Sequence, residues 1–385
     1  MKKALLVDTN FSAGPISEAL LNEGYRVLTV GARASDCLAG TREDYHHLDY
    51  SNVEDLASLA NRLGVDVLVP GCNDLSYRVC CEASAILGLP SLETPRAVAS
   101  LHDKEKFRDL CSALSLPAPR HFIDIDSAVA SGAKIIVKPT DAFSGRGIEV
   151  VDCPTPDRLA TSILRSSNYS SSGNALLEEY VEGNLFSYSA FLADGRVNCA
   201  FNVAEFGSVN PFVVDTSYVI DVPDREHELK VAVERIAAEL GFCSGLMHLQ
   251  YIASQSQLWI IEPTRRCPGD LYASLIEFAT GYPYAQSYVR CLTNRSIARA
   301  SGVVKRNIVR HTVSAAEAGI FESITMTGTS DLIAWFPLAT VGDHLTPSPG
   351  GRVAVSFFAP QNVSSRDALM EALLSGTIFD IRYAT

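Results

Sequence analysis

The first hundred residues alternate short apolar segments with amphipathic segments that end at glycine, and this alternation strongly limits the folds open to the chain. Glycine is the usual residue just past a helix C-terminus, so the amphipathic segments are predicted to be helices and the apolar ones strands. The successive segments are Ala4–Val7, Ile16–Glu23, Tyr25–Val30, Val53–Leu63, Val67–Pro70 and Ser76–Leu87. Strands joined by helices of this length form a parallel sheet covered on both faces. Residues 1–100 are therefore predicted to be an open parallel α/β domain.

Hairpins replace this alternation in the rest of the chain. Two antiparallel hairpins are predicted, one turning at Asp194-Gly195 and one spanning Gly245–Glu262. A long amphipathic helix, Asp224–Leu240, lies between them. This mixture predicts an α+β region over residues 101–295. Short strands, Pro-Gly turns and one last helix predict a small β-rich domain over residues 296–385.

Composition and charge exclude several classes of protein. The 385 residues are 47% hydrophobic, which is too apolar for a disordered chain. The formal charge of −12, from 32 basic and 44 acidic residues, disfavours a nucleic-acid partner, because binding to phosphate backbones needs excess cations. No segment approaches the roughly 18 apolar residues of a membrane span, and the first apolar run stops at Asp8, short of a signal peptide. Ten cysteines without a C-x-x-C pair indicate reduced thiols. We therefore expect a soluble cytoplasmic protein with no membrane partner.

The hairpin Gly245–Glu262 carries the most informative polar residues. The strand period of two places His248 and Gln250 on one face. A loop centred on Ser256 would place Gln250 directly opposite Glu262, with Cβ atoms about 5 Å apart. Two oxygen-bearing side chains this close can form a platform for Mg²⁺, which prefers hard oxygen ligands. A hydrogen-bonded cross-strand pair is the alternative.

Glu262 also has two arginines close by in the sequence. It follows the apolar run Trp259-Ile260-Ile261 and is expected to be buried, so its carboxylate needs a partner or a bound group. Arg265 and Arg266 lie just beyond. Either one can pair with Glu262, or can grip a substrate carboxylate or phosphate through two hydrogen bonds.

A second candidate site surrounds Lys138, which ends an apolar strand and precedes the small-residue loop Asp141–Gly147. A lysine and a run of backbone N–H groups can surround phosphates, although two glycines in a strand-to-strand turn also serve geometry alone. Lys104 on its helix and Glu178-Glu179 near a strand end are ordinary surface features when taken singly. No cysteine has the histidine and basic neighbours of a nucleophile.

Taken in order, these motifs resemble those of the ATP-grasp superfamily. They are Asp103-Lys104 before a helix, Val137-Lys138-Pro139, Ser144-Gly145-Arg146-Gly147, Glu178-Glu179-Tyr180-Val181-Glu182-Gly183, His248-x-Gln250 and Ile261-Glu262-x-Thr264-x-Arg266. The similarity covers roughly residues 1–295. It looks nearest to the branch of carbamoyl-phosphate synthetase, biotin carboxylase and the amino-acid ligases.

The resemblance implies a fold and a reaction. The fold would be an N-terminal open α/β domain, then two α+β subdomains that clasp ATP, then a small C-terminal domain. A substrate carboxylate would attack the γ-phosphate of ATP to give ADP and an acyl phosphate, and an amine or a thiol would then displace phosphate. The expected enzyme is a carboxylate–amine ligase that forms a C–N bond and acts on an amino acid or similar small carboxylate. Because relatives are often dimers, a homodimer is a further expectation.

The resemblance also implies roles for individual residues. Expected ATP contacts are Lys104, Lys138, Ser144, Gly145 and Gly147 around the phosphates, and Glu178, Glu179, Tyr180, Val181 and Glu182 around the adenosine. Expected ligands of Mg²⁺, or of Mn²⁺ in its place, are Gln250, Glu262 and Thr264. Expected catalytic groups are Arg266 and Arg146, and expected substrate contacts are Asp215, His248 and Arg265.

Three positions depart from the family pattern. Gln250 stands where the first metal ligand is usually Glu, as it also does in carbamoyl-phosphate synthetase. Thr264 replaces an Asn, and Leu185 replaces a ribose-binding Glu, which leaves Glu182 as the candidate for the ribose. An inactive ATP-binding module and a carbamoyl-phosphate-type phosphotransferase therefore stay open as alternatives. A nicotinamide-dependent dehydrogenase is disfavoured, because the loop after the first strand lacks G-x-G-x-x-G.

Overall fold

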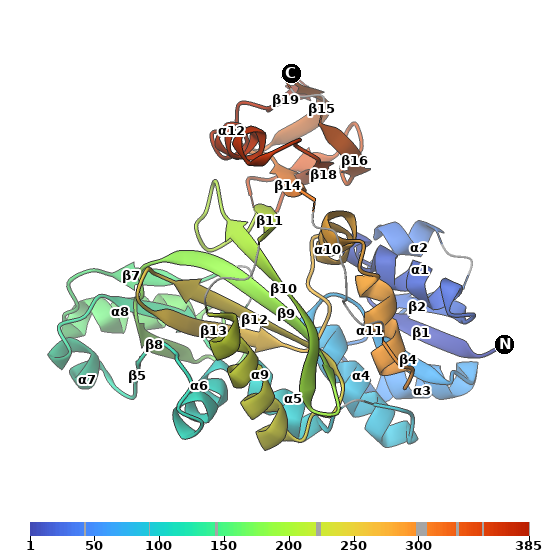
Figure 1. Cartoon of the computed structure of the whole chain (residues 1–385), viewed down its shortest axis with the longest axis horizontal. Helices are drawn as coiled ribbons and strands as arrows, with labels where there is room; N and C mark the ends of the chain where they lie inside the picture. Colours follow the sequence, from blue (N-terminus) through green and yellow to red (C-terminus); the bar gives the residue numbers. More distant parts are fainter. Residues whose placement is uncertain are drawn as a thin grey trace.

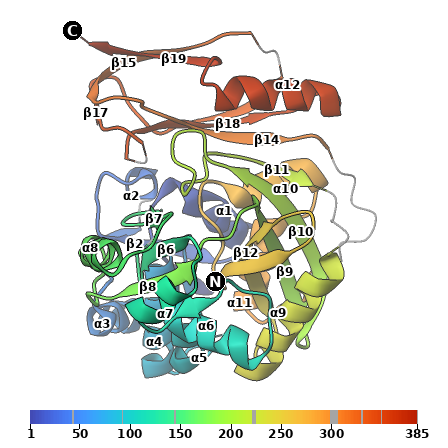
Figure 2. The same cartoon turned by 90° about the vertical axis from the view of Figure 1, so that its left-hand side faces the viewer.

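The computed structural model describes residues 1–41, 44–91, 93–142, 145–220, 225–297, 306–328, 331–348 and 350–384. Asp224, predicted to begin the long helix, lies outside these ranges. Figures 1 and 2 show the arrangement of the described elements from two directions.

The N-terminal part contains the predicted parallel sheet. Its strands pair in the order β3-β2-β1-β4 and are β1 (Lys3–Val7), β2 (Arg26–Gly31), β3 (Tyr45–His47) and β4 (Val67–Pro70). The helices that follow these strands are α1 (Gly14–Asn22), α2 (Cys37–Thr41), α3 (Val53–Leu63) and α4 (Asp74–Leu87). Asn52 caps α3, and Gly64 ends it with a left-handed φ of 62°. The predicted bounds of α3 and β4 are confirmed.

Two helices and a small antiparallel sheet come next. The helices are α5 (Pro95–His102) and α6 (Lys104–Ala113). The sheet has the order β5-β8-β6-β7, with strands β5 (His121–Phe122), β6 (Ile135–Pro139), β7 (Glu149–Val151) and β8 (Ala175–Glu179). Helices α7 (Ile125–Ala130) and α8 (Pro156–Ser167) pack on it through one apolar cluster. This sheet carries Lys138 and Glu178 toward the rest of the molecule.

The central feature is an eight-stranded sheet of order β13-β12-β9-β10-β11-β14-β18-β16. Its first five strands are β9 (Asn184–Ala193), β10 (Arg196–Phe206), β11 (Thr216–Ile220), β12 (Gly245–Ala253) and β13 (Leu258–Thr264). Helix α9 (Glu226–Leu240) covers one face. Helices α10 (Tyr272–Thr280) and α11 (Tyr284–Leu292) cover the other face and join it to the N-terminal sheet in one core. Both predicted hairpins are confirmed.

The C-terminal part is only partly separate from this sheet. Its strands β14 (Val309–Ser314), β16 (Leu332–Pro337) and β18 (Arg352–Phe358) extend the central sheet, because β14 pairs with β11. A second, three-stranded sheet consists of β15 (Gly319–Met326), β17 (His344–Leu345) and β19 (Phe379–Ala384). Helix α12 (Val363–Leu374) lies between the two layers (Figure 2) and packs on β14 and β18. Among the described helices, none is both long and apolar enough to cross a membrane.

Candidate nucleotide and metal site

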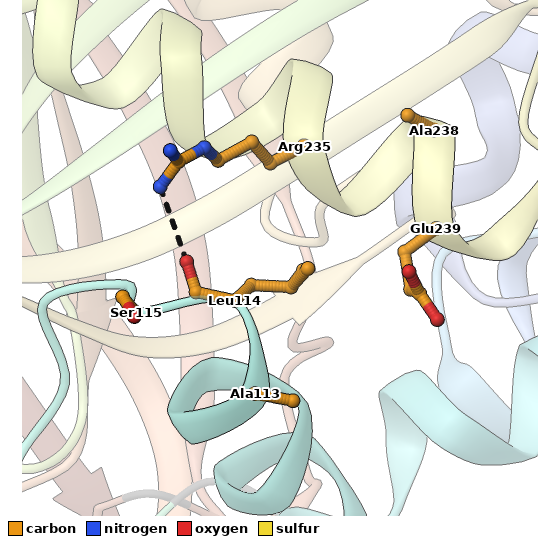
Figure 3. A pocket seen from close by; sticks show the side chains of 6 residues that line it. All are labelled: Ala113, Leu114, Ser115, Arg235, Ala238 and Glu239. Atoms are coloured by element: carbon orange, nitrogen blue, oxygen red, sulfur yellow. Dashed lines mark hydrogen bonds between the residues drawn. The ribbon is translucent and has the colours of Figure 1, made fainter.

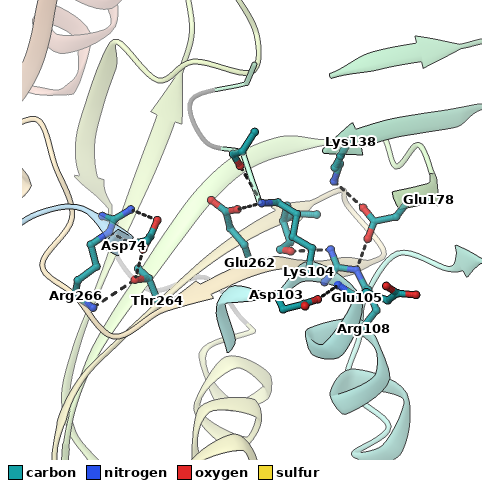
Figure 4. A network of polar contacts seen from close by, with 12 residues as sticks. Asp74, Asp103, Lys104, Glu105, Arg108, Lys138, Glu178, Glu262, Thr264 and Arg266 are labelled. Carbon is teal, nitrogen blue, oxygen red and sulfur yellow. Dashed lines mark hydrogen bonds and ion pairs between the residues drawn. The ribbon is translucent and has the colours of Figure 1, made fainter. Parts of the chain in front are cut away.

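A buried carboxylate holds two cations where the small sheet approaches α6 (Figure 4). Lys138 on β6 donates from Nζ to Glu178 Oε2 on β8 at 2.7 Å, and Arg108 on α6 donates from Nε to Oε1 of the same carboxylate. The Glu178 side chain is fully buried. Burial alone would raise the pKa of Glu178, but Lys138 and Arg108 outweigh it and lower that pKa to about 2. The carboxylate therefore stays ionised and fixes both cations.

Arg108 also connects the small sheet to the central sheet. Its Nη2 donates to the main-chain oxygen of Ile261 on β13 at 2.7 Å. Its Nη1 is buried and has no hydrogen-bond partner among the described residues. The sequence interpretation missed Arg108, although its spacing of four from Lys104 puts both side chains on one face of α6.

Lys104, the first residue of α6, brings the two candidate regions together. Asp103 caps the helix by accepting from the N–H groups of Glu105 and Lys106, which sets the position of Lys104. Lys104 Nζ donates to the main-chain oxygen of Ala142 at 3.1 Å and lies 3.9 Å from Glu262 Oε2. One ammonium group thus links the loop after β6 with the hairpin acid.

The glycine loop packs against the central sheet. Gly145 has a left-handed φ of 67°, and a Cβ there would lie 2.8 Å from Phe212 Cβ in the loop between β10 and β11. Gly147 has a φ of 69° and lies close to Tyr169 and Pro139. Both positions therefore require glycine for conformation and for space. Ser144 lies outside the described residues, and Arg146 is exposed.

The predicted pairing of Gln250 with Glu262 is confirmed, and it depends on a bulge. Ala253 pairs with Leu258 and Tyr251 with Ile260, which alone would set Ile261 opposite Gln250. The register shifts between Gln250 and Tyr251, so that Gln250 faces Glu262 instead. The bulge is what places the two oxygen-bearing side chains opposite each other.

The prediction that Glu262 is buried is wrong. Its side chain is 48% exposed, and within the apolar run before it only Ile260 is fully buried, with Trp259 and Ile261 half-buried. Gln250 instead contacts a buried acid that the sequence interpretation missed. Its Nε2 donates to Glu205 Oε2 on β10 at 2.8 Å. The alternation Phe201, Val203, Glu205 along β10 could have identified that inward-facing position.

Arg266 is held by the N-terminal part of the chain. Its Nε donates to Asp74 Oδ1 at 2.8 Å and its Nη2 to Asp74 Oδ2 at 3.3 Å. The Thr264 hydroxyl donates to Asp74 Oδ1 at 3.1 Å. Burial raises the pKa of Asp74, but the Arg266 guanidinium outweighs this and holds it well below its usual range. Thr264 therefore serves to orient Asp74 in this structure.

Two of the three predicted substrate contacts are enclosed in the core. Arg265 is 1% exposed, donates from Nε to Glu93 at 2.8 Å and from Nη2 to the Ser244 oxygen at 2.6 Å, and stacks over Phe242. Its charge and donors are directed into the core, and its predicted contact with substrate stays a prediction.

His248 is buried as well. Its Nδ1 lies 2.6 Å from Ser189 Oγ, its ring meets Tyr272 edge-on, and burial lowers its pKa to about 3.

Asp215, the third predicted substrate contact, accepts a hydrogen bond from the Ser208 N–H at 2.7 Å and so organises its own loop.

The predicted adenine-reading segment is partly used within the small sheet. The N–H of Glu179 donates to the Arg120 oxygen and that of Tyr180 to the Lys134 oxygen, both at 2.8 Å. These donors are unavailable to a nucleotide. Val181 and Glu182 lie just past β8, and their predicted contact with adenosine stays a prediction.

Two hollows in the described part of the chain lie away from these residues. One, of about 480 Å³, lies between α6 and α9, where Arg235 Nη1 donates to the Leu114 oxygen at 3.1 Å (Figure 3). The other, of about 1050 Å³, lies between α1, α10 and β16 and includes Phe11, Leu271 and Phe336. Neither contains a residue of the candidate site.

Comparison with known proteins finds similarity in sequence and in fold. No family model matches the chain. The chain is 25% identical over 320 residues to the carbamoyl phosphate synthase large chain of Kocuria rhizophila. The match covers 77% of this chain and 28% of that protein. The chain thus spans between a quarter and a third of the length of that curated relative.

Solved structures share the whole fold. L-amino acid ligase from Bacillus licheniformis superimposes with a TM-score of 0.80 at 16% identity, covering 100% of this chain and 99% of that one. The biotin carboxylase domain dimer of Hydrogenobacter thermophilus 2-oxoglutarate carboxylase, a complex with MgADP and bicarbonate, gives 0.78 at 16% identity, covering 99% and 90%. The chain therefore has the ATP-grasp fold and is related in sequence to the carbamoyl phosphate synthase large chain.

Proposed function

We propose that the chain is an ATP-dependent ligase that activates a small carboxylate as an acyl phosphate and transfers it to an amine, or alternatively to a thiol. The observation that carries this proposal is the meeting of Lys104 with Glu262 at 3.9 Å. It joins a lysine from the helix after the N-terminal part to an acid on the hairpin. The relatives support the same assignment, since they include an L-amino acid ligase and a carbamoyl phosphate synthase.

The nucleotide would lie between the small sheet and β13. Lys104 and Lys138 would contact its phosphates, with the loop at Gly145–Gly147 packed over them. The main chain at Val181 and Glu182 would contact the adenosine. Arg108, which bonds to both β8 and β13, would fix the spacing between the two sides and leave Nη1 as a further donor.

The residues present fit a Mg²⁺ ion. Gln250 and Glu262 offer oxygen atoms from directly opposed strand positions, and Mg²⁺ commonly takes one or two protein ligands, with substrate phosphates and water completing the set. In the described ranges no group of three or more His, Cys, Asp and Glu side chains is arranged to hold a metal. When bound, the ion would neutralise phosphate charge. Mn²⁺ stays an alternative metal.

The proposed chemistry needs positioning rather than a covalent nucleophile. A carboxylate oxygen would attack the γ-phosphorus of ATP. The bond between that phosphorus and the β–γ bridging oxygen would break, and ADP would leave. Arg266, fixed by Asp74 at two points, would hold the substrate carboxylate or the transferring phosphoryl group. The amine nitrogen would then attack the acyl carbon and phosphate would leave. Exclusion of water by the glycine loop would protect the acyl phosphate.

An ADP-release screen tests this proposal. Carboxylates and amines are paired combinatorially with Mg-ATP, and we expect release that requires both and is lost in Glu262→Gln. Glu234→Gln, a change in a surface ion pair with Arg196, should leave release intact. Thermal stabilisation by ATP without turnover of any pair would favour the inactive module instead. Failure to bind ATP would overturn both.

Cytoplasmic location and a homodimer stay predictions. The biotin carboxylase domain noted above is named as a dimer, which supports the second. Sedimentation analysis of the purified chain would measure it directly.

A further inference from the structure

We propose that Glu205 is a positioning residue, which fixes the side-chain amide of Gln250 so that its oxygen, and not its nitrogen, is presented beside Glu262. The inference rests on the proposed function, since it concerns the same metal platform. It explains how a glutamine can serve at a position where the orientation of the amide decides whether a cation meets an acceptor or a donor.

The contact between the two side chains defines the orientation. An ionised carboxylate only accepts hydrogen bonds, so it pairs with the NH₂ group of an amide and never with its oxygen. The Nε2 atom of Gln250 donates to Glu205 Oε2 at 2.8 Å. Glu205 is 7% exposed, and the side chain of Ser187 on β9 lies beside its carboxylate. Burial among these neighbours restricts where the carboxylate can lie.

The strand order determines where the amide oxygen then points. In the central sheet β12 lies between β13 and β9, and β10 lies beyond β9. Glu205 on β10 and Glu262 on β13 therefore flank Gln250 from opposite sides. With the nitrogen drawn toward β10, the oxygen is left on the side of β13, where Glu262 lies opposite Gln250 in register. The two oxygen donors thus converge on one position.

This assignment gives Glu205 a role that acts only through Gln250. Supporting groups behind metal ligands often change metal affinity about 10-fold to 100-fold when they are replaced. In Glu205→Gln the two amides can pair in either orientation, so Gln250 is no longer fixed. In Gln250→Met there is no amide left to orient, so Glu205 has nothing to act on.

The test is a double-mutant cycle on Mg²⁺ binding, measured by calorimetry as the Mg²⁺ dependence of ADP affinity. We expect Glu205→Gln to weaken the Mg²⁺ effect about 10-fold. The double variant should match Gln250→Met alone, because the two changes remove one interaction. ADP binding in EDTA should be the same in all variants, and Glu234→Gln serves as the matched charge control.

Each other outcome would reject the inference in a recognisable way. If the double variant has a smaller Mg²⁺ effect than Gln250→Met, and the difference equals the full effect of Glu205→Gln, then Glu205 is a direct ligand of the metal. If Glu205→Gln lowers both the melting temperature and the affinity for ADP in EDTA, the role of Glu205 is merely structural. If the unmodified chain binds ADP without any Mg²⁺ effect, the metal platform of the proposed function fails as well, whereas a normal Mg²⁺ effect that Glu205→Gln leaves unchanged rejects this inference alone.

Discussion

Asp74 grips Arg266 through two hydrogen bonds, of 2.8 and 3.3 Å, across 192 residues of sequence. Asp74 begins α4, so the N-terminal α/β part contributes directly to the position of the proposed catalytic arginine. The guanidinium is thereby oriented before any substrate arrives, which reduces the reorganisation needed during the reaction.

Replacing Asp74 should therefore affect turnover more than nucleotide binding. In Asp74→Asn the side chain keeps its size but loses the charge that orients Arg266, and we expect kcat to fall about 10-fold or more with little change in ATP affinity. Steady-state kinetics with the identified substrate pair would measure both values. Glu82→Gln, in the surface pair with Arg78 on the same helix, should have neither effect, and equal kcat in both variants would contradict the role.

Lys104 and Lys106 offer a matched pair on one helix. Lys104 approaches Glu262 and the loop after β6, whereas Lys106 is exposed and lies 3.5 Å from Asp103. If Lys104 contacts phosphate, Lys104→Met should weaken ATP binding about 10-fold, as expected for loss of a charge-assisted hydrogen bond. Lys106→Met should leave it within about twofold. Calorimetric titration with a non-hydrolysable ATP analogue compares the two directly.

Glu178 predicts a specific acid sensitivity. Its pKa is lowered from 4.5 to about 2, so its ionised form stabilises the fold fully above pH 4.5, and this contribution is lost as the pH falls toward 2. The shift corresponds to about 3 kcal/mol of unfolding free energy. Urea unfolding between pH 7 and pH 2.5 should show this loss in the unmodified chain. In Glu178→Gln the chain should already be destabilised at pH 7, and the slope should be flatter.

A comparison of Gly145 with Gly173 can distinguish the effect of a steric clash from the effect of backbone strain. Both have left-handed φ values, 67° and 72°, but a Cβ at Gly145 would meet Phe212 at 2.8 Å, whereas one at Gly173 would meet nothing within 4 Å. Both variants should share a backbone strain of roughly 1–2 kcal/mol. Gly145→Ala should in addition displace the loop, and so weaken ATP binding several-fold more than Gly173→Ala. Equal ATP affinity in Gly145→Ala and Gly173→Ala would show that the contact with Phe212 does not position the loop.

Arg265 should behave as a structural residue. Arg265→Met leaves Glu93 buried beside an apolar chain and should cost roughly 3–5 kcal/mol of unfolding free energy. Adding Glu93→Gln removes the unpaired charge and should recover part of that loss. Chemical denaturation measures both. Lost turnover in a variant with unchanged stability would restore Arg265 to the substrate site.

The parts of the fold set by local chemistry could be predicted from the sequence. Asn52 and Gly64 delimit α3 through a side-chain cap and a left-handed glycine, and both effects depend on neighbouring residues alone. The pairing of Gln250 with Glu262 was predicted as well, but the loop is not centred on Ser256 as that prediction assumed, because Ala253 pairs with Leu258. A bulge at Gln250 and Tyr251 restores the pairing. The residues of the hairpin alone do not predict that bulge.

Long-range packing decided what the sequence could not. Arg265 and Arg266 are adjacent and chemically alike, yet Glu93 draws the first into the core and Asp74 holds the second at the site. Glu205 and Arg108 were missed because their partners lie on other elements. A single sequence carries no signal for contacts that only the folded sheets create.

The pairing of β14 with β11 has a practical consequence for anyone who shortens this chain. Removing residues 306–384 would remove β14, the neighbour of β11. The N–H and C=O groups of β11 would then be unpaired, and an exposed edge strand of this kind promotes aggregation. Ser217 on that strand would also lose Arg310, which donates to it at 2.9 Å. The last eighty residues therefore cannot be treated as a removable appendage, and an insoluble truncation would report a broken sheet rather than a missing activity.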